Sequence, residues 1–90
     1  MPLDLRPRSD VVSRRLGDEV VLVNLRTNRI YSLNRTGARL WELLVEQAER
    51  STIEATMLEE FDVDPSELHN EIDKLLGELA QAGLVDDGTS

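Results

Sequence analysis

The segment from Gly17 to Trp41 constrains the fold of this chain more than any other. It reads GDEVVLVNLRTNRIYSLNRTGARLW, with turn signals at Gly17-Asp18 and at 26–28 on either side of an apolar, β-branched run at 20–25. Glycine and asparagine tolerate the positive φ that tight hairpin turns require. The central run is apolar on both faces, which is typical of a middle strand. We therefore predict a meander of three strands, at 10–16, 20–25 and 29–33.

The third predicted strand, RIYSL, has two different faces and an open edge. Alternation places Arg29, Tyr31 and Leu33 on one face, and Ile30 and Ser32 on the other. The outer strand of a meander has unpaired N–H and C=O groups, which can accept a further strand. No proline or lysine protects this edge. The third strand is therefore a candidate site for binding an extended peptide.

Three helices are predicted after the strands. Asn34 or Thr36 caps the first, which continues to about residue 47. Ser51-Thr52-Ile53-Glu54 fits a capping box and opens a short second helix that ends near residue 61. Because the only tryptophan, Trp41, lies in the apolar stripe of the first helix, we expect it to anchor the core.

The third helix has the strongest start signal. Asp64 is in the cap position, and Pro65 occupies the first helical position. The helix extends to about Ala82, and Gly83 ends it. Apolar residues recur along it at helical spacing. They are Leu68, Ile72, Leu75, Leu76 and Leu79.

The order of elements predicts the fold class. It is α+β and winged helix-turn-helix-like, with a three-stranded antiparallel sheet followed by three helices. Ninety residues suffice for one small domain with a thin core. We place this domain at 10–85, between a flexible N-terminal tail at 1–9 and a C-terminal tail at 86–90.

Charge is distributed unevenly between the two halves of the chain, whose net charge is −8. Residues 1–41 contain eight arginines and four acids, which gives +4. Residues 42–90 contain fourteen acids against Arg50 and Lys74, which gives −12. The acidic half would repel nucleic acid and anionic lipid and attract a basic partner, or it serves solubility alone. No segment is apolar enough for a signal peptide or a membrane span, so we expect a cytoplasmic protein with no membrane partner.

The residue types needed for catalysis are scarce. The chain has no cysteine and one histidine, His69, which we expect to be an exposed helix residue. The acids at 59–64 lack the spacing of a calcium loop, and the glycines are single rather than clustered around a phosphate. The sequence therefore predicts no enzymatic activity, no metal site and no cofactor.

Two kinds of macromolecular ligand remain for a winged-helix shape. One is DNA, which such folds often bind through the third helix. That helix carries Glu67, Glu71, Asp73, Lys74 and Glu78, a net charge of −3 that opposes phosphate. The other is an extended, partly basic peptide, held by the third strand and by apolar pockets on the third helix, with the acids at the rim. In the simplest alternative, Tyr31, Leu33 and the helix leucines form only core.

The residues also carry a resemblance to a known family. The hairpin that enters Tyr31-Ser32-Leu33-Asn34, then Thr36-Gly37, then Leu40-Trp41, resembles the pyrroloquinoline quinone synthesis protein D family, also called precursor-peptide recognition elements. The likeness covers about residues 10–85. A stand-alone chain of this size is most similar to the split leader-binding protein of lasso peptide gene clusters.

The resemblance implies a function and a site. The function is non-catalytic binding of the leader segment of a ribosomally made precursor peptide, and its presentation to a separate cysteine protease and then a cyclase. In this family the leader adds as an antiparallel strand on the third strand and packs on the third helix. The implied site is Arg29, Ile30, Tyr31, Ser32, Leu33, Glu67, Leu68, Glu71, Ile72, Leu75 and Leu76. A DNA-binding or transcription-accessory domain, and a subunit of a larger enzyme, remain as alternatives.

Overall fold

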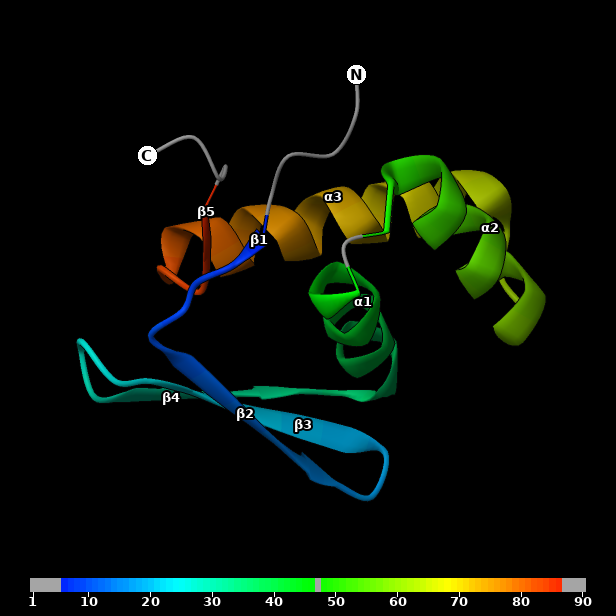
Figure 1. Cartoon of the computed structure of the whole chain (residues 1–90). Helices are drawn as coiled ribbons and strands as arrows, with labels where there is room; N and C mark the ends of the chain where they lie inside the picture. The colour runs from blue at the N-terminus through cyan, green and yellow to red at the C-terminus, as the bar shows by residue number, and fades with distance from the viewer. Residues whose placement is uncertain (1–5, 47, 87–90) are drawn as a thin grey trace.

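The computed structural model of this chain describes residues 6–46 and 48–86. Its elements follow in the order strands, helices and a short closing strand (Figure 1). They are β1 (Arg6–Pro7), β2 (Val11–Leu16), β3 (Glu19–Asn24), β4 (Arg29–Leu33), α1 (Arg35–Val45), α2 (Arg50–Glu60), α3 (Pro65–Gln81) and β5 (Val85–Asp86).

The main sheet is the predicted three-stranded antiparallel meander. Its order is β2-β3-β4, so the doubly apolar strand is central, as expected. Gly17 (φ 64°) and Asn28 (φ 61°) both adopt the left-handed conformation in the two hairpin turns. The register pairs Val20 with Leu33 and Leu22 with Tyr31, which fixes the face that each strand turns toward the helices.

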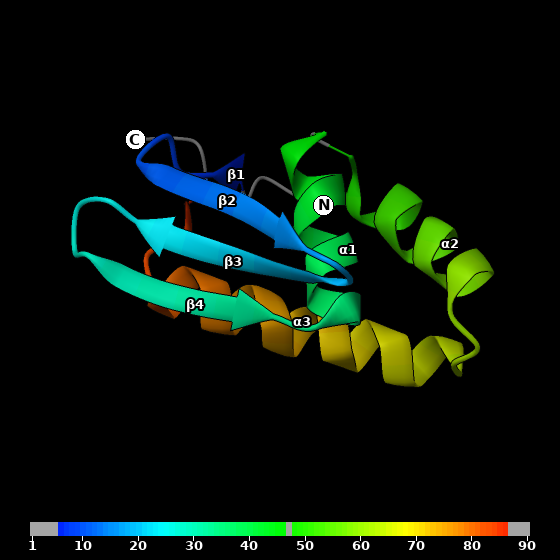
Figure 2. The same ribbon diagram turned by 90° about the horizontal axis from the view of Figure 1, so that it is seen from below.

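The helices cover one face of this sheet and leave the other bare. Figure 1 shows α1 and α3 on the same side of the sheet, and Figure 2 looks onto the uncovered side. Val20 and Leu22 of β3 point into the core and are 4% and 0% exposed. On the outer face, Val12 and Ile30 flank Val23 in the cross-strand register and remain largely exposed. The sheet therefore contributes one face to folding, and the core lies between that face and the helices.

The turn from β4 into α1 is tightly packed. The side chain of Asn34 accepts a hydrogen bond of 3.0 Å from the N–H of Gly37, so Asn34 rather than Thr36 caps the helix. A Cβ on Gly37 would lie 3.3 Å from the side chain of Leu33, a tight contact, so any other residue here would require Leu33 to shift. Trp41 is 3% exposed and belongs to the core, as predicted.

The start of α2 differs from the prediction. The helix begins at Arg50 after Glu49, and no side chain caps it, so the capping box at 51–54 is wrong. Glu54 instead bonds the side chains of Arg50 on the same helix and His69 on α3, so it is not free to cap the backbone N–H groups at the start of α2. Local sequence cannot reveal a competing partner fifteen residues away.

The end of α3 closes the domain. Asp64 caps the helix as predicted, and its pKa is lowered because the Ser66 hydroxyl and N–H groups bond its carboxylate. Gly83 has φ 74°, and Leu84 and Val85 turn back into the core. None of the helices in the described residues is both long and apolar enough to cross a bilayer.

A second, two-stranded sheet was not foreseen from the sequence. Arg6–Pro7 pairs antiparallel with Val85–Asp86, and the N–H of Arg8 donates to the carbonyl of Leu84 at 3.1 Å. The described part of the segment predicted as a flexible tail is thus paired with β5 and with Leu84. Residues 1–5 and 87–90 of the two predicted tails lie outside the described residues.

Removing the Trp41 side chain tests the core. Trp41→Ala should lower the free energy of unfolding by about 3–5 kcal/mol, because it leaves a large cavity between α1 and β3. The indole Nε1 has no hydrogen-bond partner among the described residues, so Trp41→Phe should cost clearly less. Urea denaturation followed by circular dichroism measures both values. Equal losses for the two variants would contradict the cavity argument.

Candidate peptide-binding groove

The free edge of β4 is the first component of the site. Among the described residues β4 pairs with β3 on one side and with nothing on the other. Its outward N–H and C=O groups are therefore available to an added strand. Figure 2 shows α3 running along β4 in the opposite direction, on the covered side of the sheet. An added strand on β4 would lie beside α3.

Two hollows lie between the β4 side and α3, one toward each end of the strand. The first, of about 510 Å³, joins the start of β4 to the end of α3. The second, of about 220 Å³, joins the segment just after β4 to the start of α3. The first is lined by Arg8, Asn24, Arg26, Thr27, Arg29, Tyr31 and Gln81 to Gly83. The second is lined by Asn34, Thr36, Phe61, Val63, Glu67, Leu68 and Glu71.

The strand residues proposed from the sequence divide between the two faces as the alternation predicted. Tyr31 is half-buried and lines the first hollow, while Leu33 is buried. Ile30 is 67% exposed on the outer face, and Ser32 is exposed beside it. Side chains at 30 and 32 thus lie on the bare face of the sheet, away from α3 and from the two hollows.

The helix residues proposed from the sequence are mostly core. Leu68, Ile72 and Leu76 are 3%, 0% and 6% exposed. Leu75 is half-buried against the core, and Glu67 and Glu71 are exposed. The three buried side chains pack in the core under α3. Leu68 also lines the second hollow, and the half-buried Leu75 offers further apolar surface to a ligand.

Comparison with known proteins agrees with this architecture. The sequence model of the family described as coenzyme PQQ synthesis protein D (PqqD) matches residues 19–85, well over half of the chain. This chain belongs to the PqqD family. No curated protein matches the chain significantly.

Two solved structures share the PqqD-like fold over nearly all of their length. "TbiB1 in Complex with the TbiA(beta) Leader Peptide" is 31% identical, with a TM-score of 0.86, over 90% of this chain and 94% of that one. "Lasso peptide synthetase B1 complexed with the leader peptide" is 19% identical, with a TM-score of 0.84, over 92% of this chain and 98% of that one. Both were solved with a leader peptide, as their descriptions state.

In this PqqD family member, one buried amide holds the groove together. Asn24 at the end of β3 is 2% exposed. Its side-chain nitrogen donates to the carbonyl of Gly83 at 3.1 Å, and its oxygen accepts from the N–H groups of Arg26 and Thr27 at 2.9 and 3.3 Å. The β3–β4 turn is thereby fastened to the end of α3. Sequence reasoning treated Asn24 only as a strand residue. It missed the role of its side chain, because the hydrogen-bond partner Gly83 lies 59 residues away.

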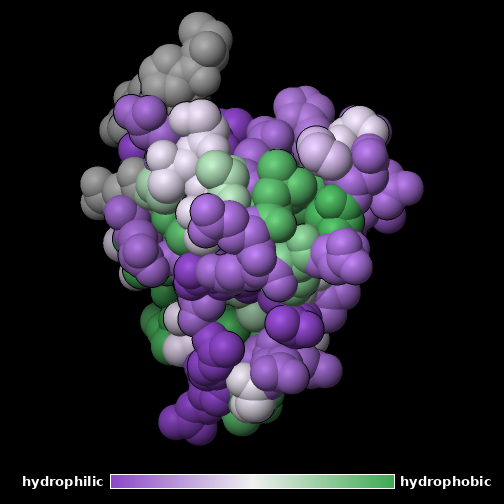
Figure 3. All heavy atoms as spheres, turned by 90° about the vertical axis from the view of Figure 1, so that its right-hand side faces the viewer, coloured by the Kyte–Doolittle hydropathy of each residue, from purple (hydrophilic) through white to green (hydrophobic). Residues whose placement is uncertain are grey.

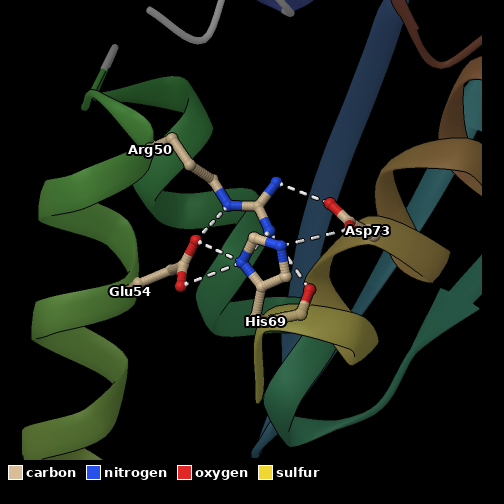
Figure 4. A network of polar contacts seen from close by, with 4 residues as sticks. All are labelled: Arg50, Glu54, His69 and Asp73. Carbon is tan, nitrogen blue, oxygen red and sulfur yellow. Dashed lines mark hydrogen bonds and ion pairs between the residues drawn. The ribbon is translucent and has the colours of Figure 1, made fainter. Parts of the chain in front are cut away.

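A second polar cluster lies away from the groove, between α2 and α3 (Figure 4). Arg50 bonds Glu54 at 2.5 Å and Asp73 at 2.9 Å, and Nδ1 of His69 lies 3.1 Å from Glu54. Figure 3, which views the molecule from the α2 side, shows a mainly hydrophilic face with a smaller hydrophobic patch. His69 is 53% exposed in its side chain, so it is the exposed helix residue that was expected, with partners that were not. This cluster fastens one helix to the other.

The cluster predicts a pH-dependent contribution to stability. Burial alone would raise the pKa of Glu54, but hydrogen bonds and charge interactions with Arg50 and His69 outweigh it and lower the pKa. A carboxyl whose pKa is lower in the folded than in the unfolded state stabilises the protein at a pH above its unfolded-state pKa, about 4.3. This stabilisation is lost as the pH falls through the folded-state pKa. Glu54→Gln should therefore lower the free energy of unfolding by about 1 kcal/mol at neutral pH.

Urea denaturation at several pH values measures this effect. The difference between Glu54→Gln and the natural chain should shrink as the pH falls below about 4. Glu59→Gln is the control, because Glu59 lies on the same helix, is exposed and forms no ion pair with the described residues. A difference for Glu54→Gln that is constant down to low pH would contradict the assignment.

Proposed function

We propose that this chain is a non-catalytic adaptor that binds the leader segment of a ribosomally made precursor peptide, from a lasso peptide pathway, by strand addition on β4. The observation that carries the proposal is the bare edge of β4 beside two hollows that α3 helps to line. The relative TbiB1, 31% identical, supports it because its description names a bound leader peptide.

The main chain and the side chains of the ligand would have separate tasks. Hydrogen bonds to β4 provide affinity for an extended backbone with little regard to its sequence. Alternate side chains of an added strand point to the covered side, toward the half-buried Tyr31 of β4 and the half-buried Leu75 of α3. Selectivity then depends on the two hollows. The charges on α3 are acidic apart from Lys74. Because acidic side chains repel the phosphates of DNA, they support a peptide as the ligand.

The chemistry of processing would belong to other proteins. The chain contains no cysteine, and its single histidine lies in the α2–α3 cluster rather than in the groove. We propose that the bound leader is presented to a separate cysteine protease and then to a cyclase. The edge of β4 and α3 would hold the leader, so the partner enzyme would approach from the exposed side of the bound strand.

An amide-shift titration tests the binding site. The ¹⁵N-labelled protein is titrated with the TbiA(beta) leader peptide and with the leader of the precursor encoded nearest to this chain. We expect the shifts to concentrate at 29–33 and on the β4-facing side of α3. Shifts confined to β2 and α2 would contradict the site, and no binding by either peptide would contradict the proposed function.

Two substitutions on the same strand form a matched pair for the same assay. Tyr31→Ala should weaken leader binding about tenfold or more, because it removes an aromatic wall of the groove. Ile30→Ala should change affinity by less than about twofold, because that side chain is on the outer face. Fluorescence anisotropy measures both affinities, and thermal unfolding confirms that both variants are folded. A larger loss for Ile30→Ala would place the ligand on the outer face instead.

A further inference from the structure

The groove is electrically polarised along its length. Arg26 and Arg29 line the hollow at the start of β4, and Glu67 and Glu71 line the hollow after its end. None of these four side chains forms an ion pair with any of the residues the structure describes. Four charges are thus grouped by sign at opposite ends of one strand.

Neighbouring charges reduce this polarity without removing it. At the acidic end, the guanidinium of Arg35 lies 5.0 Å from the ring centre of Phe61, which lines the second hollow, so one cation stands near two acids. Arg8 also lines the first hollow, but Asp10 and Asp86 bond it at 3.1 and 3.4 Å and neutralise it. The hydrogen bond from Arg8 is the main cause that lowers the pKa of Asp10, and the charge of Arg26 adds only a smaller effect, so Asp10 is engaged chiefly by Arg8. Helical geometry places Lys74 and Glu78 on the same side of α3, between the two ends of the groove. Their charges have opposite signs and therefore offset each other. The termini of α3 each contribute about half a charge of opposing sign, which is small against two full charges at each end.

The two ends are far enough apart to act separately. A strand of five residues at about 3.4 Å per residue spans roughly 14 Å between its first and last Cα atoms. The Debye length at physiological ionic strength is about 8 Å. Each end therefore attracts its own counter-charge without being cancelled by the other.

We infer that the groove selects a peptide by the order of its charges. Acidic side chains of the ligand lie beside Arg26 and Arg29, and basic ones lie beside Glu67 and Glu71. All pairings of the main sheet are antiparallel, and antiparallel pairing is slightly more stable per residue, so the added strand runs opposite to β4. The ligand then carries its basic residues first and its acidic residues about five positions later. The inference rests on the proposed function and specifies its ligand.

Charge order would act mainly on specificity and on the rate of association. Charges at the rim of an interface steer the encounter and disfavour a wrong register, and salt weakens both effects. Four such contacts, each of a fraction of a kcal/mol, amount to about tenfold in affinity at low salt. A peptide of reversed charge order would be disfavoured by a similar factor, because each of its ends would meet like charge.

Selection from a library of random peptides tests the inference and requires no leader sequence. Folded protein is used to enrich binders from displayed 14-residue random peptides at low salt. We expect enriched peptides to have lysine or arginine before an apolar segment and aspartate or glutamate after it. Resynthesis of one binder with its charged residues exchanged end for end, at constant composition, should weaken binding about tenfold at low salt and much less at about 0.5 M salt.

A charge-exchange variant provides the decisive control. Arg26→Glu and Arg29→Glu combined with Glu67→Lys and Glu71→Lys reverse both ends at exposed positions, so the fold should survive. This variant should prefer the exchanged peptide over the original one. A nitroxide at the N-terminus of the original peptide should broaden amides near Glu71 rather than near Arg29 in the natural protein.

The outcomes separate this inference from the proposed function. Binders that shift the amides of 29–33 but show no charge order, or the reverse order, would overturn the inference and leave strand addition intact. Binders that leave 29–33 unshifted, or a failure to enrich any binder, would overturn both. Retention of the original preference by the charge-exchange variant would also overturn the inference.

Discussion

The groove depends on one buried hydrogen-bonding group. Asn24 is the only buried residue with a charged or amide side chain among the described residues. Two of its side-chain hydrogen bonds hold the β3–β4 turn, and the third joins that turn to Gly83 at the end of α3. A buried amide without partners costs about 1–3 kcal/mol, so the turn and the helix end cannot separate without leaving these groups unpaired. This constraint sets the start of β4 beside the end of α3. The other end of the strand is positioned by the cap of α1, where Gly37 packs on Leu33. β4 is therefore fixed at both ends while its edge stays open.

Such an arrangement separates the surface that folds the domain from the surface that can bind. The inward side chains of β3 and α3 are almost wholly used by the core, and Leu68, Ile72 and Leu76 illustrate this most clearly. A small domain has little apolar surface to spare, so a binding site made of exposed leucines would weaken the core that supports it. A strand edge avoids this conflict, because main-chain groups bind without being withdrawn from the core. The half-buried Tyr31 and Leu75 then supply contact area at modest cost to solubility.

Local sequence was sufficient for most of the fold and insufficient for the details of the site. Gly17 and Asn28 marked both hairpin turns because the left-handed conformation restricts the residues that can occupy it. Asp64-Pro65 marked the start of α3 for a similarly local reason. The Asn24 amide, the β1–β5 pairing and the contact of Glu54 with His69 could not be foreseen, because each depends on a residue distant in the chain. The same limit applies to burial: a helical stripe shows which side chains face inward, but not which of them neighbouring elements leave open.

The charge asymmetry between the two halves of the chain acquires a structural meaning in the fold. Several arginines of the basic half pair with acids of the acidic half across elements: Arg15 with Glu42, Arg39 with Glu60, and Arg8 with Asp86. These pairs join the sheet to α1, α1 to α2, and the segment just after β1 to β5. Exposed pairs of this kind contribute little stability each, about 0–1 kcal/mol, but they neutralise the charges around the core. Charges outside such pairs then stand out by position, and those at the two ends of β4 are sorted by sign. A ligand that approaches the open edge meets these charges before it forms its first hydrogen bond, since charge acts over about 8 Å and hydrogen bonding over about 3 Å.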